Sequence, residues 1–535
     1  MTHNTNWHVD AVFYELYVRA FADGNNDGHG DFIGLRDKLD YLEWLGVDCV
    51  WLLPMYPSPL RDDGYDIASY YGIHPQYGLM EDFKMTIDAI HARGMKVITD
   101  LVMNHTSDEH PWFKESRRSK DSPLRDWYVW SDTNEKYQDA RIIFTDTETS
   151  NWAYDEPTGE YYWHRFYSSQ PDLNFDNPAV RQEMFKIAAF WLEMGIDGFR
   201  ADAVPYLIER EGTNCENLPE THDFLKELRT YMDEHFPGTI LLGEANQWPE
   251  DLMPYFGDGT DEFHMCFHFP VMPRLFKALA TESRIDVVQI LEDTPAIPDT
   301  VQWATFLRNH DELTLEMVSE ADRQFMWDTY APEPRMRLNV GIRRRLAPLL
   351  DNDRRKIELM HSLLYTLPGA PVMYYGDEIG MGDNIELFDR NGVRTPMQWN
   401  DTDNGGFSQV PRNTLYAPAI EGEEYGYSTV NVASQQLDTS SLLHTVRDML
   451  SVRKGLNMLA KGEMVWLDQH PMASLSFIRR DANGTLVALH NLTDADLIVD
   501  VPQGKYRDVL TGHTYGPGEL KLAPYGYYWL LRTDN

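Results

Sequence analysis

The sequence predicts a (β/α)8 TIM barrel that carries an inserted lobe (domain B) after its third strand and is followed by a C-terminal antiparallel β-sandwich domain. Three observations lead to this fold class. From residue 11 onward, short apolar segments of strand type alternate with segments of helical period, as in parallel βαβ units. The alternation stops over residues 104–171, which are rich in Trp, Tyr, Asp and Ser. After about residue 457 only short strands and turns remain, which is typical of an antiparallel domain.

The barrel elements are expected in regular order along the chain. Strands are expected at 11–18, 47–54, 96–102, 198–203, 239–245, 265–271, 301–310 and 370–379. Helices are expected at 31–45, 80–93, 179–194, 220–235 and 353–366, where apolar residues recur at helical spacing. A polar segment at about 312–350 precedes the last helix and predicts a second excursion from the barrel. The expected domains are 1–103 with 172–456 for the barrel, 104–171 for the lobe and 457–535 for the β-sandwich.

The composition limits the classes of partner. The 535 residues include 47 Lys+Arg and 85 Asp+Glu, which gives a formal charge of −38. A field of this sign repels phosphate groups, so nucleic acids and anionic membranes are disfavoured and a neutral substrate such as a carbohydrate is favoured. The three cysteines, Cys49, Cys215 and Cys266, have no CxxC spacing, which disfavours a disulfide framework or a zinc site. The first residues lack an apolar signal segment, so a soluble cytoplasmic protein is expected.

Carboxylates stand at the ends of several predicted strands, where TIM barrels carry their chemistry. Asp202 ends the fourth strand, Glu244 the fifth and Asp311 the seventh. A single Asp at such a position is commonly a helix N-cap, but several on one face are costly unless they have a function. Retaining glycosyl transfer needs two carboxylates about 5–5.5 Å apart, and neighbouring strands about 4.8 Å apart can supply them. Arg200 lies two residues before Asp202, on the same side of the strand, and is expected to keep that carboxylate ionised.

Together these motifs resemble a known family. DLVMNH, GFRADA, GEA and NHD occur in the order of the signature regions of the α-amylase superfamily (glycoside hydrolase family 13), and QPDLN resembles its fifth region. The resemblance implies that Asp202 is the nucleophile, Glu244 the acid/base and Asp311 the transition-state stabiliser. It also implies that the sugar is bound by the residues at matching positions, which are Asp62, Tyr65, Asp100, His105, Phe166, Arg200, His310 and Arg394. In the glucosidase-like branch, this pocket is closed at one end and receives a terminal glucose.

Segments 203–226, 243–256 and 306–317 resemble the trehalose-forming branch of the superfamily, the maltose α-D-glucosyltransferases. This implies the disaccharides maltose and trehalose as substrates, a covalent β-glucosyl-Asp intermediate and minor hydrolysis to glucose. Asn246 and Glu312 could bind the cleaved glucose, or they could be supporting scaffold, and the excursion at 312–350 could cap the pocket. The alternative function is an α-glucosidase or oligo-1,6-glucosidase with an open acceptor site. A non-enzymatic barrel is disfavoured because all three catalytic carboxylates are present.

Two metal sites are expected, and no organic cofactor. In the loop 23–31, oxygens stand at the spacing of a calcium loop, at Asp23, Asn25, Asp27, the carbonyl of His29 and Asp31. Gly34 stands where an EF-hand has its bidentate Glu, so the site would bind Ca²⁺ or Mg²⁺ in another geometry, and a plain Asp/Gly turn is the alternative. The family resemblance implies a second, structural Ca²⁺ site formed by Asn104, Asp172, Glu209 and the carbonyls of Tyr206 and Leu207, with a hydrogen-bonded cluster as the alternative. The oligomeric state stays open, and a homo-oligomer is one possibility.

Overall fold

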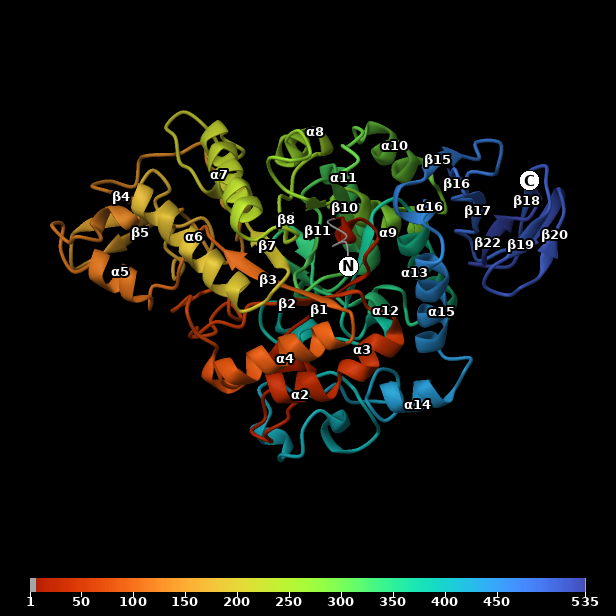
Figure 1. Cartoon of the computed structure of the whole chain (residues 1–535), viewed down its shortest axis with the longest axis horizontal. Coiled ribbons are helices and arrows are strands. Elements are labelled where there is room, and N and C mark those ends of the chain that lie inside the picture. The colour runs from red at the N-terminus through yellow and green to blue at the C-terminus, as the bar shows by residue number, and fades with distance from the viewer. Residues whose placement is uncertain (1–5, 535) are drawn as a thin grey trace.

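The computed structural model describes residues 6–534, and its centre is a closed barrel of eight parallel strands (Figure 1). The strands lie around the barrel in the order β1-β14-β10-β9-β8-β7-β3-β2. Their bounds are β1 (Phe13–Leu16), β2 (Cys49–Leu52), β3 (Lys96–Val102), β7 (Gly198–Asp202), β8 (Ile240–Gly243), β9 (Met265–Phe267), β10 (Gln302–Phe306) and β14 (Ala370–Tyr374). All eight predicted barrel strands are present, so the predicted fold class is confirmed.

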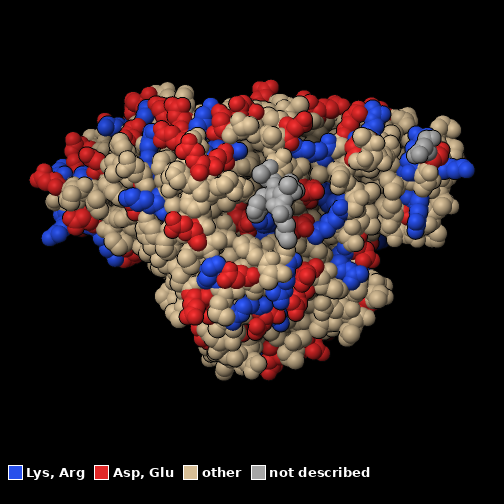
Figure 2. Space-filling view, viewed as in Figure 1, with Lys and Arg blue, Asp and Glu red and all other residues tan. Residues whose placement is uncertain are grey.

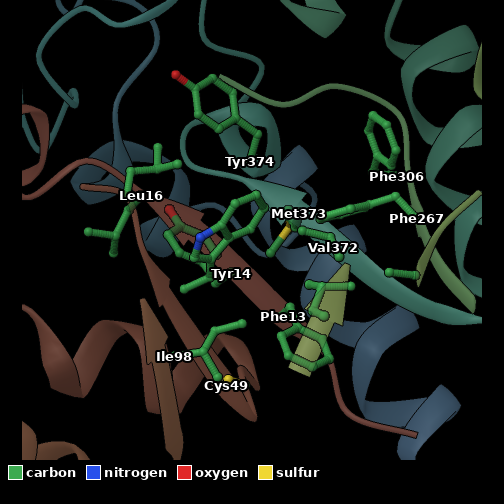
Figure 3. Packing of buried hydrophobic residues seen from close by; sticks show 14 of the residues in the cluster. Phe13, Tyr14, Leu16, Cys49, Ile98, Phe267, Phe306, Val372, Met373 and Tyr374 are labelled. Carbon is green, nitrogen blue, oxygen red and sulfur yellow. The ribbon is translucent and has the colours of Figure 1, made fainter. Parts of the chain in front are cut away.

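The barrel interior is filled by the side chains of these strands. Phe13, Phe267, Phe306 and Val372 come from four different strands and are 0–3% exposed (Figure 3). Parallel strands are covered on both faces, which explains why their sequences are nearly continuous apolar runs. An ionisable residue inside such a run, as Glu15 is in β1, therefore needs a specific reason to be there.

The helices form the outer layer. α4 (Met80–Ala92), α6 (Pro178–Glu193), α7 (Pro219–His235) and α13 (Arg354–Thr366) lie where they were predicted. The helix predicted at 31–45 is divided into α2 (Phe32–Asp37) and α3 (Leu39–Leu45), because the backbone of Lys38 leaves the helical region. α9 (Val271–Thr281), α10 (Ile285–Asp293) and α15 (Leu442–Lys454) complete the layer. Within residues 6–534, no helix has both the length and the apolar composition of a membrane span.

The inserted lobe carries α5 (Pro111–Ser116) and a small sheet of β4 (Trp130–Ser131), β6 (Glu160–Trp163) and β5 (Trp152–Asp155). It projects from the end of β3 at one side of the barrel (Figure 1). An isolated bridge between His105 and Asp172 joins the two ends of the lobe, and a second bridge connects Tyr128 in its middle to Leu173. The second excursion contains β11 (Leu313–Thr314), α11 (Glu320–Tyr330), β12 (Arg337–Leu338), β13 (Gly341–Ile342) and α12 (Leu346–Leu349).

The C-terminal domain is an antiparallel β structure, as predicted. Its larger sheet consists of β15 (Glu463–Trp466), β16 (Phe477–Asp481), β17 (Gly484–His490), β22 (Tyr527–Arg532), β19 (Tyr506–Asp508) and β20 (Thr514–Tyr515). The smaller sheet pairs β18 (Leu497–Val501) with β21 (Gly518–Leu522), and buried residues of both sheets form one cluster. The exact domain limits at 103/104, 171/172 and 456/457 stay predictions. On the face seen in Figure 2, carboxylates are most dense along the upper edge.

Candidate active site

A pocket opens at the C-terminal ends of the barrel strands, and it contains most of the predicted site residues. Nine of them line it, namely Asp62, Tyr65, His105, Phe166, Asp202, Glu244, Asn246, Asp311 and Glu312. Arg200, His310 and Arg394 contact these residues from behind. Seven further residues line the pocket and were not predicted, namely Phe144, Ala203, Phe269, Asn309, Thr314, Glu316 and Arg390. The strand-end argument therefore located the pocket but not its full wall.

Asp202 and Glu244 are neighbours because β7 and β8 pair in register, with Ala201 opposite Gly243. Asp202 is the last residue of β7, and Glu244 follows the last residue of β8. Between them, the N–H of Ala203 donates a hydrogen bond of 3.0 Å to Oε2 of Glu244. Ala203 holds a left-handed backbone conformation with φ of 51°, an unfavourable state for a residue with a Cβ. Strain of this kind is found where a functional geometry is fixed by its surroundings.

The guanidinium of Arg200 joins both carboxylates. Nη1 lies 2.5 Å from Oδ1 of Asp202 and 2.5 Å from Oδ1 of Asp100, and Nη2 lies 2.6 Å from Oε1 of Glu244. The predicted contact between Arg200 and Asp202 is therefore present. Burial raises the pKa of Asp202 to about 6 although Arg200 opposes the rise, and burial raises the pKa of Glu244 to about 7. Near neutral pH, Asp202 is thus mainly ionised, while a large fraction of Glu244 keeps its proton.

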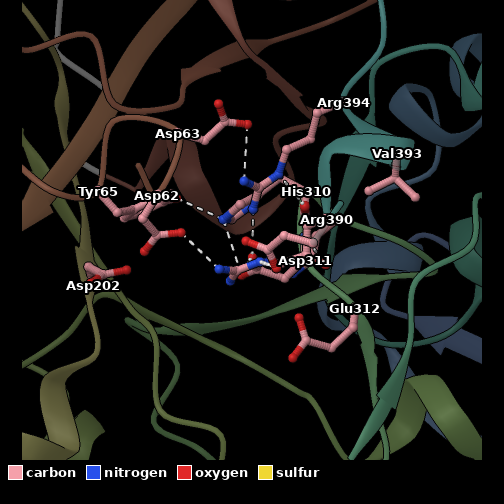
Figure 4. Close-up of polar contacts among 12 residues, drawn as sticks. Asp62, Asp63, Tyr65, Asp202, His310, Asp311, Glu312, Arg390, Val393 and Arg394 are labelled. Carbon is pink, nitrogen blue, oxygen red and sulfur yellow. Dashed lines mark hydrogen bonds and ion pairs between the residues drawn. The ribbon is translucent and has the colours of Figure 1, made fainter. Parts of the chain in front are cut away.

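We name the end of the pocket around Asp62 and Asp311 the donor end (Figure 4). Arg390 connects the two carboxylates, with Nη2 2.8 Å from Oδ1 of Asp62 and Nη1 2.9 Å from Oδ1 of Asp311. Arg394 adds a second contact to Oδ1 of Asp311 at 3.0 Å. Although burial acts to raise the pKa of Asp311, His310 and the two arginines hold it below its usual value. Sequence reasoning included Arg394 and missed Arg390, four residues earlier, although the buried Asp62 required a cation.

His310 forms the floor of the donor end. Its Nε2 lies 2.8 Å from the hydroxyl of Tyr65 and 3.1 Å from Oδ2 of Asp311. The ring of Tyr65 is stacked on the imidazole with 5.3 Å between centroids. Opposite, His105 packs against Phe166, and its buried Nε2 has no hydrogen-bond partner within residues 6–534. The floor is rigid, and one free ring nitrogen is left for a polar ligand.

The other end of the pocket, formed by Asn246, Glu312, Thr314 and Glu316, is named the acceptor end. Nδ2 of Asn246 donates to Oε2 of Glu316 at 3.0 Å. Oδ1 of Asn246 and Oε2 of Glu312 are buried and have no partner in the described part of the chain. Such atoms are costly to leave unpaired, about 1–3 kcal/mol each, so this end is suited to bind hydroxyl groups.

Contacts between the lobe and the second excursion lie beside the acceptor end. The N–H of Asn339 in the excursion donates to Oδ2 of Asp146 in the lobe at 2.8 Å. Nδ2 of the same residue donates to Oε1 of Glu312 at 3.1 Å. A second contact joins Arg141 of the lobe to Glu316 at 3.0 Å. These contacts are consistent with the expectation that the excursion covers the pocket.

The side chains of the second predicted metal site fit a calcium ion. Asn104, Asp172 and Glu209 are buried, and each has one side-chain oxygen without a hydrogen-bond partner among the residues described. Burial raises the pKa of Asp172 and of Glu209, and the negative charge of Asp172 raises the pKa of Glu209 further. Tyr206 and Leu207, whose carbonyls were also predicted as ligands, belong to the segment that leads to Glu209. Oxygen atoms alone form this set, as Ca²⁺ prefers.

The loop at 23–31 differs from that cluster. Oδ1 of Asp23 accepts the N–H of Asn26 at 2.6 Å, and Oδ2 of Asp31 accepts that of Asn25 at 3.0 Å. Asp27 accepts from the N–H of His29 at 3.0 Å. Within the described residues, no group of three or more His, Cys, Asp or Glu side chains is arranged to hold a metal ion. The carboxylates here are engaged by backbone N–H groups, and a metal at this loop stays a prediction.

Comparison with known proteins agrees with this geometry. Residues 15–329 and 342–462 match the family model for the α-amylase catalytic domain. The trehalose synthase/amylase TreS of Mycobacterium tuberculosis is 55% identical over 99% of this chain and 91% of its own length. A trehalose synthase of Pimelobacter sp. (strain R48) is 53% identical over 99% of this chain and 96% of its own. The crystal structure of the trehalulose synthase MutB from Pseudomonas mesoacidophila MX-45 superimposes with a TM-score of 0.80 at 27% identity, over 98% of this chain and 99% of that one. The chain belongs to the α-amylase family and, within it, to the group that contains the trehalose synthases.

Proposed function

We propose that this protein is a trehalose synthase, which interconverts maltose and trehalose by intramolecular transglucosylation and releases some glucose by hydrolysis. The observation that carries the proposal is the acceptor end, where two buried oxygens have no partner among the described residues and belong to side chains that line the pocket together with the catalytic carboxylates. A hydrolase needs access for water at this place, whereas an isomerase must retain the cleaved glucose. The high identity to proteins named trehalose synthases supports the same conclusion.

The first step breaks the bond between the two glucose units of maltose. Glu244 donates its proton to the glycosidic oxygen while the ionised Asp202 attacks the anomeric carbon. The bond from the anomeric carbon to that oxygen breaks, and a covalent β-glucosyl ester forms on Asp202. Because Arg200 contacts both carboxylates, it stabilises the negative charge that remains on Glu244.

The donor end stabilises the transition state of this step. The sugar ring flattens and gains positive charge at the anomeric carbon, so its hydroxyl groups become better hydrogen-bond donors. Asp311 is ionised and held in place by Arg390 and Arg394, and it is positioned to accept from these hydroxyls. Interactions that strengthen only in the transition state accelerate the reaction.

The second step forms a new glycosidic bond, in which the 1-oxygen of the cleaved glucose is the attacking atom. The cleaved glucose turns at the acceptor end until its 1-OH faces the ester. Glu244 removes the proton of this hydroxyl, the oxygen attacks the anomeric carbon, and the ester bond to Asp202 breaks. Hydrogen bonds to Asn246 and Glu312 keep the glucose in the pocket during the turn. If water attacks instead, glucose is released.

Incubation with maltose and ¹³C-labelled free glucose tests the proposal. We expect trehalose as the main product, without label, because the cleaved glucose does not leave the pocket. Label in the trehalose would mean transfer to glucose from solution, and glucose as the sole product would establish the α-glucosidase alternative. An Asp202→Asn variant provides the blank, since it cannot form the ester.

Three further properties belong to this proposal. A Ca²⁺ ion held by Asn104, Asp172 and Glu209 would connect the lobe to the barrel and would contribute stability rather than chemistry. The protein would act in the cytoplasm, which agrees with three buried cysteines that are all free. Its partners would be maltose and trehalose, with no nucleic acid or membrane, and a homo-oligomer remains to be tested by light scattering.

A further inference from the structure

Glu15 lies in the middle of β1, among apolar neighbours, and its side chain is fully buried. Burying an ionisable group in a barrel core is costly unless its polar atoms are used. Neither the family motifs nor the catalytic mechanism described above gives this residue a role. The presence of a buried glutamate at this position therefore needs a separate explanation.

All hydrogen bonds that the Glu15 carboxyl makes within residues 6–534 go to one residue, His310, which is 295 positions away in the chain. Oε1 lies 2.6 Å from Nδ1 of the imidazole and accepts the backbone N–H of the same residue at 3.1 Å. The second oxygen, Oε2, is buried without a partner in this part of the chain. Among the residues described, the carboxyl of Glu15 therefore hydrogen-bonds only to His310, and only through Oε1.

That oxygen fixes the ring of His310 from behind. Nδ1 faces Glu15, so the opposite nitrogen, Nε2, faces the pocket residues Tyr65 and Asp311, with 2.8 Å to the hydroxyl of Tyr65 and 3.1 Å to Oδ2 of Asp311. Tyr65 stacks on the ring, and Trp51 contacts its edge, with centroids 5.9 Å apart. The aromatic contacts restrict tilting of the ring, and two hydrogen bonds, one between Nδ1 and Glu15 and one between Nε2 and the Tyr65 hydroxyl, define which nitrogen faces Asp311.

We infer that Glu15 is a positioning residue of the glucosyl transfer, which orients Nε2 of His310 toward the reacting sugar through the contact between Oε1 and the His310 Nδ1 and backbone N–H. A histidine oriented by a buried carboxyl on its other nitrogen is a general device of catalytic sites. The inference rests on the proposed function, because it requires that His310 touches the sugar during transfer.

Three substitutions separate positioning from simple core packing. Glu15→Gln keeps an oxygen where Oε1 lies and should retain kcat for maltose consumption within about threefold. Glu15→Met fills the same volume without an acceptor, and Glu15→Asp withdraws the carboxylate by one methylene. Both should lower kcat by about 10–100-fold with little change in KM, because misplacement of a transition-state contact has effects of this size. Glu15→Asp also serves if Glu15→Met does not fold.

Glu378→Met is the matched control. Glu378 is equally buried, in the short helix η7 (Asp377–Ile379) that follows β14, and accepts from Tyr14 and Tyr41 without touching the pocket. We expect this control to lower the thermal midpoint and to leave kcat of the folded enzyme nearly unchanged. The second test is a double-mutant cycle with His310→Ala. In a protein that already carries His310→Ala, adding Glu15→Met should cause no further loss of kcat, because the ring to be positioned is absent.

The inference is overturned if folded Glu15→Met or Glu15→Asp consumes maltose at the wild-type rate. It is also overturned if the loss from Glu15→Met is the same in the His310→Ala background, which would indicate a structural role. Failure of the proposed function would give a different result from failure of the inference on Glu15, because the wild-type protein would then produce glucose without trehalose. Maltose consumption reports on Glu15 in either case.

Discussion

The two ends of the pocket differ in how far their polar atoms are already paired. At the donor end, both oxygens of Asp62 are engaged, by Arg390 at 2.8 Å and by Gln170 at 2.8 Å, and both oxygens of Asp311 contact His310 or the arginines. At the acceptor end, Oδ1 of Asn246 and Oε2 of Glu312 remain unpaired within the described chain. The carboxylates of the donor end are therefore paired before any sugar arrives, whereas the acceptor end has carboxyl and amide oxygens left to bind hydroxyl groups.

This difference indicates a division of work. A preorganised network holds one glucose in a fixed orientation and stabilises charge without rearrangement. The glucose that is cleaved and must turn needs the opposite, a few acceptors that can bind different hydroxyl groups in succession. We therefore expect the acceptor end to determine which product forms, and the donor end with the catalytic pair to determine how fast the bond breaks.

The largest expected effect comes from removing the proton donor that serves both ends. Glu244→Gln should lower kcat for maltose by roughly 10³-fold, since general acid catalysis typically contributes 10²–10⁴-fold. Steady-state kinetics with both maltose and trehalose would show whether the two directions fall together. Glu250→Gln, an exposed residue six positions later, is the control and should behave as wild type. A Glu244→Gln variant with more than a tenth of the wild-type kcat would contradict its role.

The pH dependence should separate the two carboxylates of the catalytic pair. Asp202, with its pKa raised to about 6, must be ionised, so kcat/KM falls as the pH drops below that value. Glu244, with its pKa raised to about 7, must be protonated, so the rate also falls as the pH rises above that value. We expect a bell-shaped profile that declines about tenfold per pH unit on each side. Asp100→Asn should move the acid limb to lower pH, because the charge of Asp100 raises the pKa of Asp202. An acid limb that stays in place would be evidence against this assignment.

Asn246→Ala sharpens the comparison between the ends. It removes the unpaired Oδ1 and the bond to Glu316, but it leaves the donor end intact. We expect total maltose consumption to change by less than about threefold, while the ratio of glucose to trehalose rises about three- to tenfold, as for the loss of one hydrogen bond to a ligand. Chromatography of the products measures this ratio. Asn174→Ala, in the segment that follows the lobe and outside the pocket, should leave the ratio unchanged. If Asn246→Ala gives the wild-type ratio, Asn246 is scaffold.

The smallest expected effect concerns the proposed calcium site at Asn104, Asp172 and Glu209. Asn104 precedes His105, a wall residue of the pocket, so loss of the ion should loosen this wall. Chelation should lower the thermal midpoint by about 3–6 °C, and added Ca²⁺ should restore it. In the Glu209→Gln variant, chelation should lower the thermal midpoint less than in the wild type. This difference would assign the change in thermal midpoint to the site at Glu209. An identical shift in both proteins would place the ion elsewhere, for example at the loop 23–31.

Much of the site could be predicted because strand ends are encoded locally. The apolar runs before Asp202 and Glu244 define where two neighbouring strands end, and parallel strands bring their ends to one rim. The register of β7 and β8 then makes the two carboxylates neighbours. The break in the helix at Lys38 was not predicted, because the apolar spacing continues through it.

Other parts of the site had no local signal. Arg390 joins Asp62 across 328 positions, and the excursion meets the lobe through Asn339 and Asp146, 193 positions apart. Each of these residues lies in an irregular segment whose path depends on the packing of the whole molecule. Glu15 did have a signal, a single ionisable residue inside an apolar strand, but the sequence could not indicate that His310 is its partner.

The sequence by itself determined the barrel, its order of strands, the family motifs and the three carboxylates at the strand ends. These features follow from residue periodicity and from short motifs, which are properties of neighbouring positions in the chain. Only the tertiary structure decided which oxygens are paired and which remain free, because that depends on side chains from remote segments that meet after folding. The contrast between the paired carboxylates of the donor end and the unpaired oxygens of the acceptor end, among the residues described, is such a property, and it supports the proposal of isomerisation.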